Sequence, residues 1–190
     1  ETLGELEIQN ANLIDDKRLL SNLNSELTTL SETDALTQLY NRLKIDKILE
    51  IEVNRSRIKD STFAVILLDV DYFKSVNDTY GHNAGDEVLK ELSQVLLSNT
   101  RQSDVVGRWG GEEFIIILPD TNLDNAYKKA EILRKSIENH PFTVVGQRTS
   151  SFGVGVFRAN QTIDELISKV DIALYKAKET GRNKVCQAED

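Results

Sequence analysis

Two pairs of acidic residues stand where they could hold a metal ion together with a phosphate group. Asp69 and Asp71 follow a continuous apolar run, and Glu112 and Glu113 come directly after two glycines. Alternation along a strand would point the two aspartates to one face, at the carboxyl end where sheets of α/β proteins commonly bind ligands. Mg²⁺ prefers carboxylate oxygens and keeps coordination positions for phosphate oxygens and water. The two pairs therefore favour a site for metal-bound phosphates.

Each acidic pair also has a plainer interpretation, as turn and capping residues after a strand or as a solvated hairpin tip. If the strands on either side of Gly110 and Gly111 pair beside the first strand, however, Glu112 and Glu113 come close to Asp69. One glutamate could then complete a metal site, while the other acts as a base or a second metal ligand. We expect the glycines to let the backbone turn sharply and to let a ligand approach it.

Three basic side chains could supply the positive charge that phosphates require. Lys74 follows the first predicted strand, and Lys178 and Arg182 lie at the end of the last predicted helix. They could neutralise triphosphate oxygens, although a single basic residue is more often a solvated surface charge. The chain as a whole is acidic, with a formal net charge of -8 and a sequence pI of about 4.9. This balance argues against a broad basic surface for nucleic acid, so an anionic ligand needs locally placed cations.

The composition indicates one globular unit with an appendage. The chain has 190 residues, of which 39% are hydrophobic. Cys186 is the single cysteine, which excludes an intramolecular disulfide and fits a reducing compartment. No apolar run approaches the roughly 20 residues of a membrane-spanning helix. The chain begins with glutamate and contains no methionine, so we expect it to be a piece of a longer protein.

Hydrophobic periodicity predicts the elements that must position these residues. Strands are expected at 63–70, 105–109, 114–118 and 184–187, and a strand-like stretch covers 142–157 with an interruption near Gly146. Helices are expected at 84–99, 123–139 and 163–179. Strands that alternate with helices, together with a hairpin at the glycines, indicate an α/β (α+β) fold with a mixed sheet covered by helices.

A seven-residue leucine repeat marks the N-terminal segment. Its main positions hold Leu6, Leu13, Leu20 and Leu27, and its companion positions hold Leu23 and Leu30. Such a repeat predicts the seam of a dimeric coiled coil, with a single amphipathic helix docked on its own domain as the alternative. Ser31, Thr33 or Asp34 is expected to cap a second helix over about 35–58.

Five segments, in order and spacing, resemble the signatures of the GGDEF family of diguanylate cyclases, in its GGEEF variant. They are "TDALTQLYNR", "DVDYFKSVNDTYGHNAGD", "RWGGEEF", "SSFGVGV" and "DIALYKAKETGRN". The resemblance covers about residues 33–187. It implies a five-stranded, mostly antiparallel central sheet surrounded by helices, related to nucleotidyl cyclase and polymerase palm domains. It also divides the chain into an N-terminal signalling helix or coiled coil, 1–32, and a GGDEF catalytic domain, 33–190.

The resemblance further implies an enzyme that condenses two GTP molecules into cyclic di-GMP and two pyrophosphates, with Mg²⁺ or Mn²⁺ as cofactor. Metal ligands are then expected at Asp69, the backbone carbonyl of Val70, Glu112 and Glu113. Catalytic roles are expected for Glu113, Glu112, Asp69 and Lys74. Substrate contacts are expected from Phe73, Lys74, Asn77, Asp86, Gly110, Gly111, Lys178 and Arg182, of which Asn77 and Asp86 match guanine-reading positions.

Regulation and assembly follow from the same resemblance. Arg101 and Asp104 match the family's RxxD site, at which cyclic di-GMP inhibits, whereas neither Lys128 nor Arg134 is matched securely to the additional basic position of that site. Trp109 departs from the usual tyrosine or phenylalanine before the glycines. The implied assembly is a homodimer formed through the N-terminal helix and facing catalytic domains, controlled by an upstream sensor outside this chain.

The implied location of the catalytic domain is the cytoplasm, and a membrane anchor further upstream is left open.

Two functions other than the cyclase stay open. One is a catalytically silent receptor for cyclic di-GMP or GTP, and the other is a platform for dimerisation or partner binding. The intact acidic, guanine-reading and lysine positions favour the enzyme over both.

Overall fold

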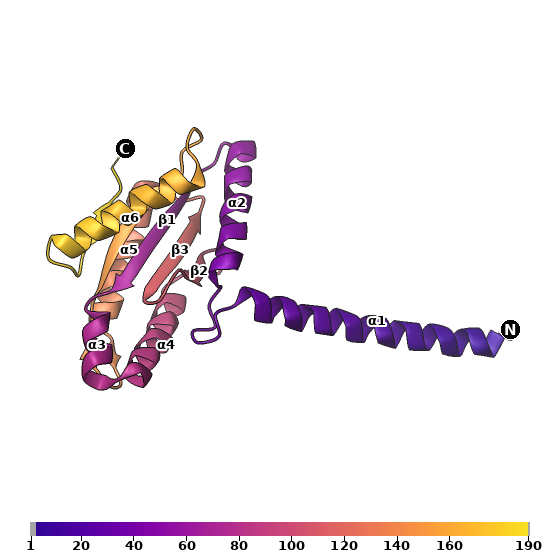
Figure 1. The fold of residues 1–190 in the computed structure, drawn as a ribbon. Helices are drawn as coiled ribbons and strands as arrows, with labels where there is room; N and C mark the ends of the chain where they lie inside the picture. Colours follow the sequence, from indigo (N-terminus) through magenta and orange to yellow (C-terminus); the bar gives the residue numbers. More distant parts are fainter. Residues whose placement is uncertain (1–2, 190) are drawn as a thin grey trace.

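A five-stranded sheet forms the centre of the molecule (Figure 1). The structure, a computed structural model, describes residues 3–189, and the side chains of 3–8, 11, 25, 26 and 28–31 lie outside this description. The strand order is β2-β3-β1-β6-β7, with β6 and β7 parallel and the other neighbours antiparallel. The strands are β1 Phe63–Val70, β2 Val105–Arg108, β3 Glu113–Pro119, β6 Ser150–Val156 and β7 Val185–Gln187. The predicted five-stranded, mostly antiparallel sheet is confirmed.

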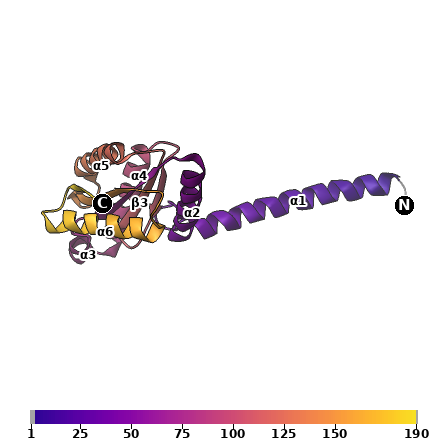
Figure 2. The same ribbon diagram turned by 90° about the horizontal axis from the view of Figure 1, so that it is seen from above.

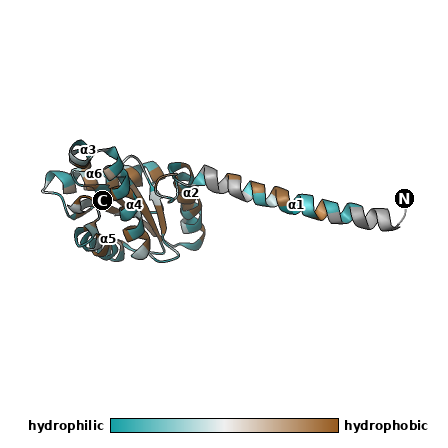
Figure 3. Ribbon diagram, turned by 90° about the horizontal axis from the view of Figure 1, so that it is seen from below, coloured by the Kyte–Doolittle hydropathy of each residue, from teal (hydrophilic) through white to brown (hydrophobic). Residues whose placement is uncertain are grey.

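Helices cover both faces of this sheet (Figure 2). The even-numbered side chains of β1 pack against α4 His82–Ser98 and α5 Leu123–Glu138, and the odd-numbered ones pack against α2 Arg42–Lys59 and α6 Ile163–Glu179. All residues of β1 are buried, which explains why its sequence is apolar without alternation. Figure 3 shows hydrophobic residues concentrated on the central strands, whereas the helices around them carry both hydrophobic and hydrophilic residues.

Three short elements were not expected from the sequence. Helix α3, Phe73–Tyr80, follows β1 directly and buries Phe73 and Val76. Its eight residues are fewer than the roughly 11 over which hydrophobic periodicity is assessed, so the pattern did not indicate a separate helix. The strand-like stretch 142–157 is divided: β4 Pro141–Phe142 and β5 Gly146–Gln147 form their own hairpin before β6 begins.

The second helix begins later than predicted. Residues 33–41 form a loop, and Asn41 caps α2 by accepting a hydrogen bond from the backbone of Lys44 at 3.0 Å. Asp34 accepts hydrogen bonds from the backbone and the hydroxyl of Thr37 at 2.8 and 2.7 Å, and Gln38 has a left-handed φ of 59°. These local bonds compete with helix formation, so the predicted start near residue 35 and the predicted caps are wrong.

Helix α1, Leu3–Glu32, projects from the domain as a long arm (Figure 1). Its described seam leucines are exposed, with 60% for Leu13, 63% for Leu20 and 63% for Leu27, so they do not dock on their own domain. Leu6 and Leu30 lie outside the described side chains. None of the helices in the described part of the chain combines the length and apolar character needed to span a membrane.

Gly153 permits the close packing of α6 on β6, which yields a first prediction. A Cβ atom there would lie 2.1 Å from the carbonyl oxygen of Val170 and 2.6 Å from the amide nitrogen of Leu174. Both are backbone atoms, so Gly153→Ala should lower the free energy of unfolding by about 2 kcal/mol or more, as measured with urea. Gly111→Ala is the control, because its Cβ meets nothing within 4 Å. Equal effects of the two substitutions would contradict this account of the packing.

Candidate active site

Asp69 lies near the end of β1 with a buried carboxylate, 7% exposed. Lys178 of α6 places its Nζ 2.7 Å from Asp69 Oδ2. Burial disfavours the charged form and raises the pKa of Asp69 to about 6; Lys178 opposes this rise, and the charges of Glu112 and Glu113 add to it. The site therefore concentrates negative charge around one buried carboxylate.

The pairing of β1 with β3 brings the second acidic pair to the first. Glu113 is the cross-strand partner of Asp69, and the Val70 amide donates a hydrogen bond of 3.4 Å to the carbonyl oxygen of Glu112. The predicted approach of the glutamates to Asp69 is therefore confirmed. Within residues 3–189, however, no group of three or more His, Cys, Asp or Glu side chains is placed to hold a metal by itself.

Gly110 and Gly111 provide space and not an unusual backbone conformation. The chain turns here from β2 into β3, as expected, and neither glycine has a left-handed φ. A Cβ atom at Gly110 would lie 2.9 Å from Glu113 Oε2, whereas one at Gly111 would meet nothing within 4 Å. The amides of Trp109 and Gly110 both donate to the Glu113 carbonyl oxygen, at 2.8 and 3.3 Å. The turn thus keeps open space beside the Glu113 carboxylate.

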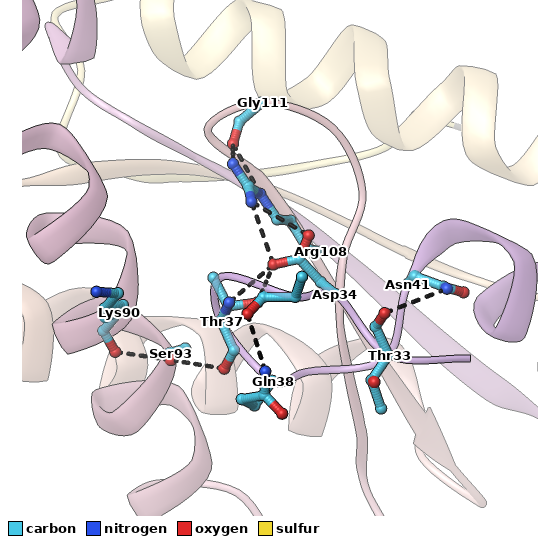
Figure 4. A network of polar contacts seen from close by, with 10 residues as sticks. Thr33, Asp34, Thr37, Gln38, Asn41, Lys90, Ser93, Arg108 and Gly111 are labelled. Carbon is cyan, nitrogen blue, oxygen red and sulfur yellow. Dashed lines mark hydrogen bonds and ion pairs between the residues drawn. The ribbon is translucent and has the colours of Figure 1, made fainter. Parts of the chain in front are cut away.

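Arg108 ties this turn to the loop that follows α1 (Figure 4). Its Nε and Nη2 donate to the carbonyl oxygen of Gly111 at 3.0 and 2.8 Å, and its Nη1 lies 3.1 Å from Asp34 Oδ1. Burial opposes ionisation of Asp34, but hydrogen bonds from Thr37 and the charge of Arg108 outweigh it, so the pKa of Asp34 is lowered. The position of the turn therefore depends on residues distant in sequence.

A second contact reaches the turn from α2. The guanidinium carbon of Arg42 lies 3.2 Å from the ring centroid of Trp109, and Arg42 Nε lies 3.1 Å from Asp46 Oδ1. A guanidinium over an indole is a favourable cation–π arrangement. Trp109 stands where tyrosine or phenylalanine was expected, and its large indole ring makes this contact with Arg42 immediately before the glycines.

The expected guanine-reading residues lie at the corner between α3 and α4. Asn77 lies against Gly85, at which a Cβ would come within 2.0 Å of Asn77 Oδ1. This oxygen is buried and has no hydrogen-bond partner within the described part of the chain. Asp86 is exposed on the first turns of α4, and Phe73 is buried beneath the corner.

The expected phosphate-binding residues come from two sides. Besides the contact of Lys178 with Asp69, Arg182 follows α6 and places its guanidinium carbon 4.6 Å from the ring centroid of Tyr72. Both side chains therefore reach the segment around the end of β1. Lys74 is exposed on α3, and no contact between it and these two residues is described.

A separate cavity of about 290 Å³ is lined by Arg101 and Asp104 together with Lys128 and Lys129 of α5. The Arg101 amide donates to Asp104 Oδ2 at 2.9 Å, and Lys129 Nζ lies 3.9 Å from the same oxygen. Arg134 instead pairs with two glutamates of its own helix. The structure thus places Lys128, and not Arg134, beside the two RxxD residues.

The sequence interpretation missed the residues that hold the site in place. Arg108 and Arg42 were not singled out, and Asp34 was expected only as a helix cap, although all three lie inside the quoted motif segments. The position of Arg108 shortly before the acidic turn was the one feature of the sequence that could have indicated its contact with that turn. The contacts with Asp34 and with the ring of Trp109 depend on tertiary structure, so spacing alone could not reveal them.

Residues 31–184 match the sequence family described as "Diguanylate cyclase, GGDEF domain". The chain belongs to the GGDEF family. The predicted membership is therefore confirmed, and the acidic turn described above is the segment for which the family is named.

Curated relatives of this GGDEF domain include two bacterial signalling proteins. The chain is 42% identical over 166 residues to diguanylate cyclase DgcM of Escherichia coli K12, covering 87% of the chain and 40% of the relative. It is 40% identical over 173 residues to response regulator PleD of Caulobacter vibrioides, covering 88% of the chain and 38% of the relative. The chain therefore spans about 40% of the length of these relatives.

Solved structures share the fold. The coiled coil and GGDEF domain of DgcB from Caulobacter crescentus, solved in complex with c-di-GMP, superimposes with a TM-score of 0.89 at 26% identity, covering 96% of this chain and 99% of that one. The active GGEEF domain of a diguanylate cyclase from Vibrio cholerae gives a TM-score of 0.75 at 34% identity, covering 79% of this chain and 97% of that one. The first match includes a coiled coil as well as the domain.

The raised pKa of Asp69 predicts a specific pH dependence of stability. An acid whose pKa is higher in the folded state takes up its proton more readily when folded, so the free energy of unfolding rises as the pH falls through about 6. Asp69→Asn removes this contribution, and without metal it should stabilise the domain more at pH 7 than at pH 5, by about 1 kcal/mol. Urea unfolding in EDTA at both pH values measures the difference. An equal effect at the two pH values would show that the Asp69 carboxylate is not perturbed.

Proposed function

We propose that this GGDEF domain is a diguanylate cyclase that condenses two GTP molecules into cyclic di-GMP and two pyrophosphates. The observation that carries the proposal is the acidic cluster at the end of β1, where buried Asp69 has Glu113 as its cross-strand partner and Glu112 beside it. The identity of 42% to a protein named diguanylate cyclase, across 87% of this chain, supports the same activity.

Asp69, the carbonyl of Val70 and Glu112 would hold Mg²⁺ or Mn²⁺ together with phosphate oxygens of the nucleotide. Mg²⁺ is commonly bound by one or two carboxylates plus phosphates and not by a cage of protein ligands. The donor set fits this mode, because it offers carboxylates but, within the described residues, no cluster of three metal-binding side chains. When bound, the metal supplies charge neutralisation on the triphosphate and makes the attacking hydroxyl easier to deprotonate.

The reaction requires a ribose 3'-hydroxyl of one GTP to attack the α-phosphorus of the other. A new P–O bond forms, the bond from the α-phosphorus to the β-phosphate oxygen breaks, and pyrophosphate leaves; a reciprocal step closes the ring. Glu113 is the candidate to accept the hydroxyl proton, since its carboxylate lies beside the open turn. The triphosphate oxygens would be bound by Lys74, Lys178 and Arg182. Lys178 would leave its ion pair with Asp69 and contact a phosphate oxygen instead.

Guanine would be read by Asn77 and Asp86. The buried oxygen of Asn77 has hydrogen-bonding capacity that the described protein groups leave unused, which is costly unless a ligand engages the amide. The exposed carboxylate of Asp86 can accept hydrogen bonds from the guanine N1–H and amino group, a pattern that adenine does not present. Phe73, Gly110 and Gly111 would lie against the nucleotide. These contacts would favour GTP over ATP.

One domain supplies half of this geometry, so two domains must face each other with one GTP each. The exposed leucines of α1 provide an apolar surface through which two chains could associate as a coiled coil. A sensor upstream of α1, in the cytoplasm or at a membrane, would then act by changing how the two domains meet.

Product inhibition would use the cavity of Arg101, Asp104 and Lys128, whose cations can bind phosphate oxygens of cyclic di-GMP.

The proposed activity predicts which substitutions stop turnover. Purified protein, stripped of bound nucleotide, should convert GTP and Mg²⁺ to cyclic di-GMP, with a rate that rises more than linearly with protein concentration. Glu113→Gln and Asp69→Asn should lower this rate by about 10²- to 10⁴-fold, because they remove the proposed base and a metal ligand. Chromatography with mass detection identifies the product, and circular dichroism verifies the fold.

Glu50→Gln is the matched control, since Glu50 is exposed on α2 away from the acidic cluster. Normal turnover in a folded Glu113→Gln variant would refute the role of that carboxylate. If the wild-type protein makes no cyclic di-GMP at any concentration but binds it, the silent receptor is the better description. Absence of both turnover and nucleotide binding would favour the platform for partners.

The RxxD cavity predicts a separate effect on inhibition. Arg101→Ala and Lys128→Ala should each raise the cyclic di-GMP concentration for half-maximal inhibition by about 10-fold or more, because each removes a charged hydrogen-bond donor. Initial rates at increasing product concentration measure this shift. Lys135→Ala, an exposed lysine on the same helix, should leave the inhibition curve unchanged. If Arg101→Ala shifts the curve no further than Lys135→Ala, the cavity is not the inhibitory site.

A further inference from the structure

The loop after α6 has an unusual backbone. Gly181, Arg182 and Asn183 all have left-handed φ values, of 116°, 61° and 46°. Residues other than glycine seldom adopt this conformation, and it persists only where surrounding contacts enforce it. Arg182 is also a proposed phosphate-binding residue, so the contacts that enforce this loop bear on the active site.

Asn183 makes most of these contacts. Its amide N–H donates to Asp71 Oδ2 at 3.0 Å, and its side-chain Nδ2 donates to Glu138 Oε1 at 2.7 Å. Its Oδ1 accepts from Arg134 Nη1 at 3.0 Å, and Arg134 Nη1 also lies 3.0 Å from Glu138 Oε2. The hydrogen bond from Asn183 is the main reason that the pKa of Glu138 is lowered, followed by the bond from Arg134. Both ends of the Asn183 amide are therefore fixed against α5.

Asp71 anchors the other end of this network. It is 3% exposed, and its Oδ1 accepts from Ser151 Oγ at 2.6 Å while its Oδ2 accepts from Thr149 Oγ1 at 2.6 Å and from the Asn183 amide. Both carboxylate oxygens are thus engaged by protein donors. The initial interpretation of Asp71 as a partner of Asp69 in ligand binding gives way to a structural anchor two residues beyond the site.

The backbone at Arg182 is held by two hydrogen bonds, one from its own amide and one from the amide of Asn183. The Arg182 amide donates to the Ala177 carbonyl oxygen at 2.9 Å, and the next amide, that of Asn183, is bound to Asp71. The Arg182 guanidinium lies over the ring of Tyr72, which follows Asp71 directly in the chain. The backbone and the side chain of the loop are therefore attached to the same short segment at the end of β1.

From this geometry we infer that Asn183 and Asp71 are positioning residues, which hold the loop so that Arg182 is presented to the triphosphate. The inference rests on the proposed function for the role of Arg182. The network of Asp71, Asn183, Glu138 and Arg134 lies outside the contacts proposed for GTP, so its residues act through Arg182 without touching the nucleotide themselves. A misplacement of about 1 Å is sufficient to reduce the effect of a positioned group strongly.

The test measures GTP affinity and loop mobility in the same proteins. Asn183→Ala should raise the dissociation constant for GTP with Mg²⁺ about 10-fold in calorimetry, and Arg182→Ala should raise it by a similar factor. The double variant should bind no more weakly than Arg182→Ala alone, because a positioning residue has no effect once the positioned group is gone. Asn139→Ala is the matched control, since this exposed asparagine at the end of α5 bonds only to its own helix in the described contacts.

Hydrogen exchange of residues 180–184 separates the inference from the proposed function. Asn183→Ala and Asp71→Asn should each accelerate exchange there, and Asn139→Ala should not. Fully additive losses of GTP affinity, or unchanged exchange in Asn183→Ala, would overturn the inference. Absence of GTP affinity in the wild-type protein would instead refute the proposed function, while the exchange experiment would still decide whether Asn183 holds the loop. Should Asp71→Asn fail to fold, Asn183→Ala carries the test alone.

Discussion

A carboxylate buried at the end of a central strand is the constraint on which this site depends. An ionised Asp69 near the end of this buried strand requires compensating positive charge, and the described structure provides it through Lys178 at 2.7 Å. The cross-strand position of Glu113 adds negative charge at the same place. Such an arrangement costs stability in the metal-free domain, and the proposed cation would offset this cost. A buried acidic cluster of this kind is typical of function and not of packing.

The acidic turn is held by segments that lie far from it in sequence. Arg108 connects the carbonyl of Gly111 to Asp34 in the loop after α1, and Arg42 at the start of α2 stacks on Trp109. A movement of α1 relative to the domain would therefore act on the loop that fixes the turn. The proposed dimer would make use of this connection, because α1 is both the proposed dimerisation arm and the neighbour of that loop.

Much of the architecture follows from the sequence, but the supporting contacts do not. The uninterrupted apolar run of β1 and the helical periodicity of α6 specify elements that the structure reproduces within a few residues. Local hydrogen bonds of Asp34 override the helical pattern expected near residue 35. Helix α3 has eight residues, fewer than the roughly 11 over which periodicity is assessed. The engagement of Asp71 by Asn183 joins residues 112 positions apart, which no local pattern encodes.

Anomalous diffraction from crystals grown with Mn²⁺ and a non-hydrolysable GTP analogue would test the central claim most directly. The account predicts a manganese peak between the Asp69 carboxylate, the Val70 carbonyl and Glu112, with phosphate oxygens completing the coordination. Lys178 should then be displaced from Asp69 toward the nucleotide, because the metal replaces its charge. A nucleotide bound without a metal at the end of β1, or a metal bound elsewhere while Lys178 stays on Asp69, would contradict the account.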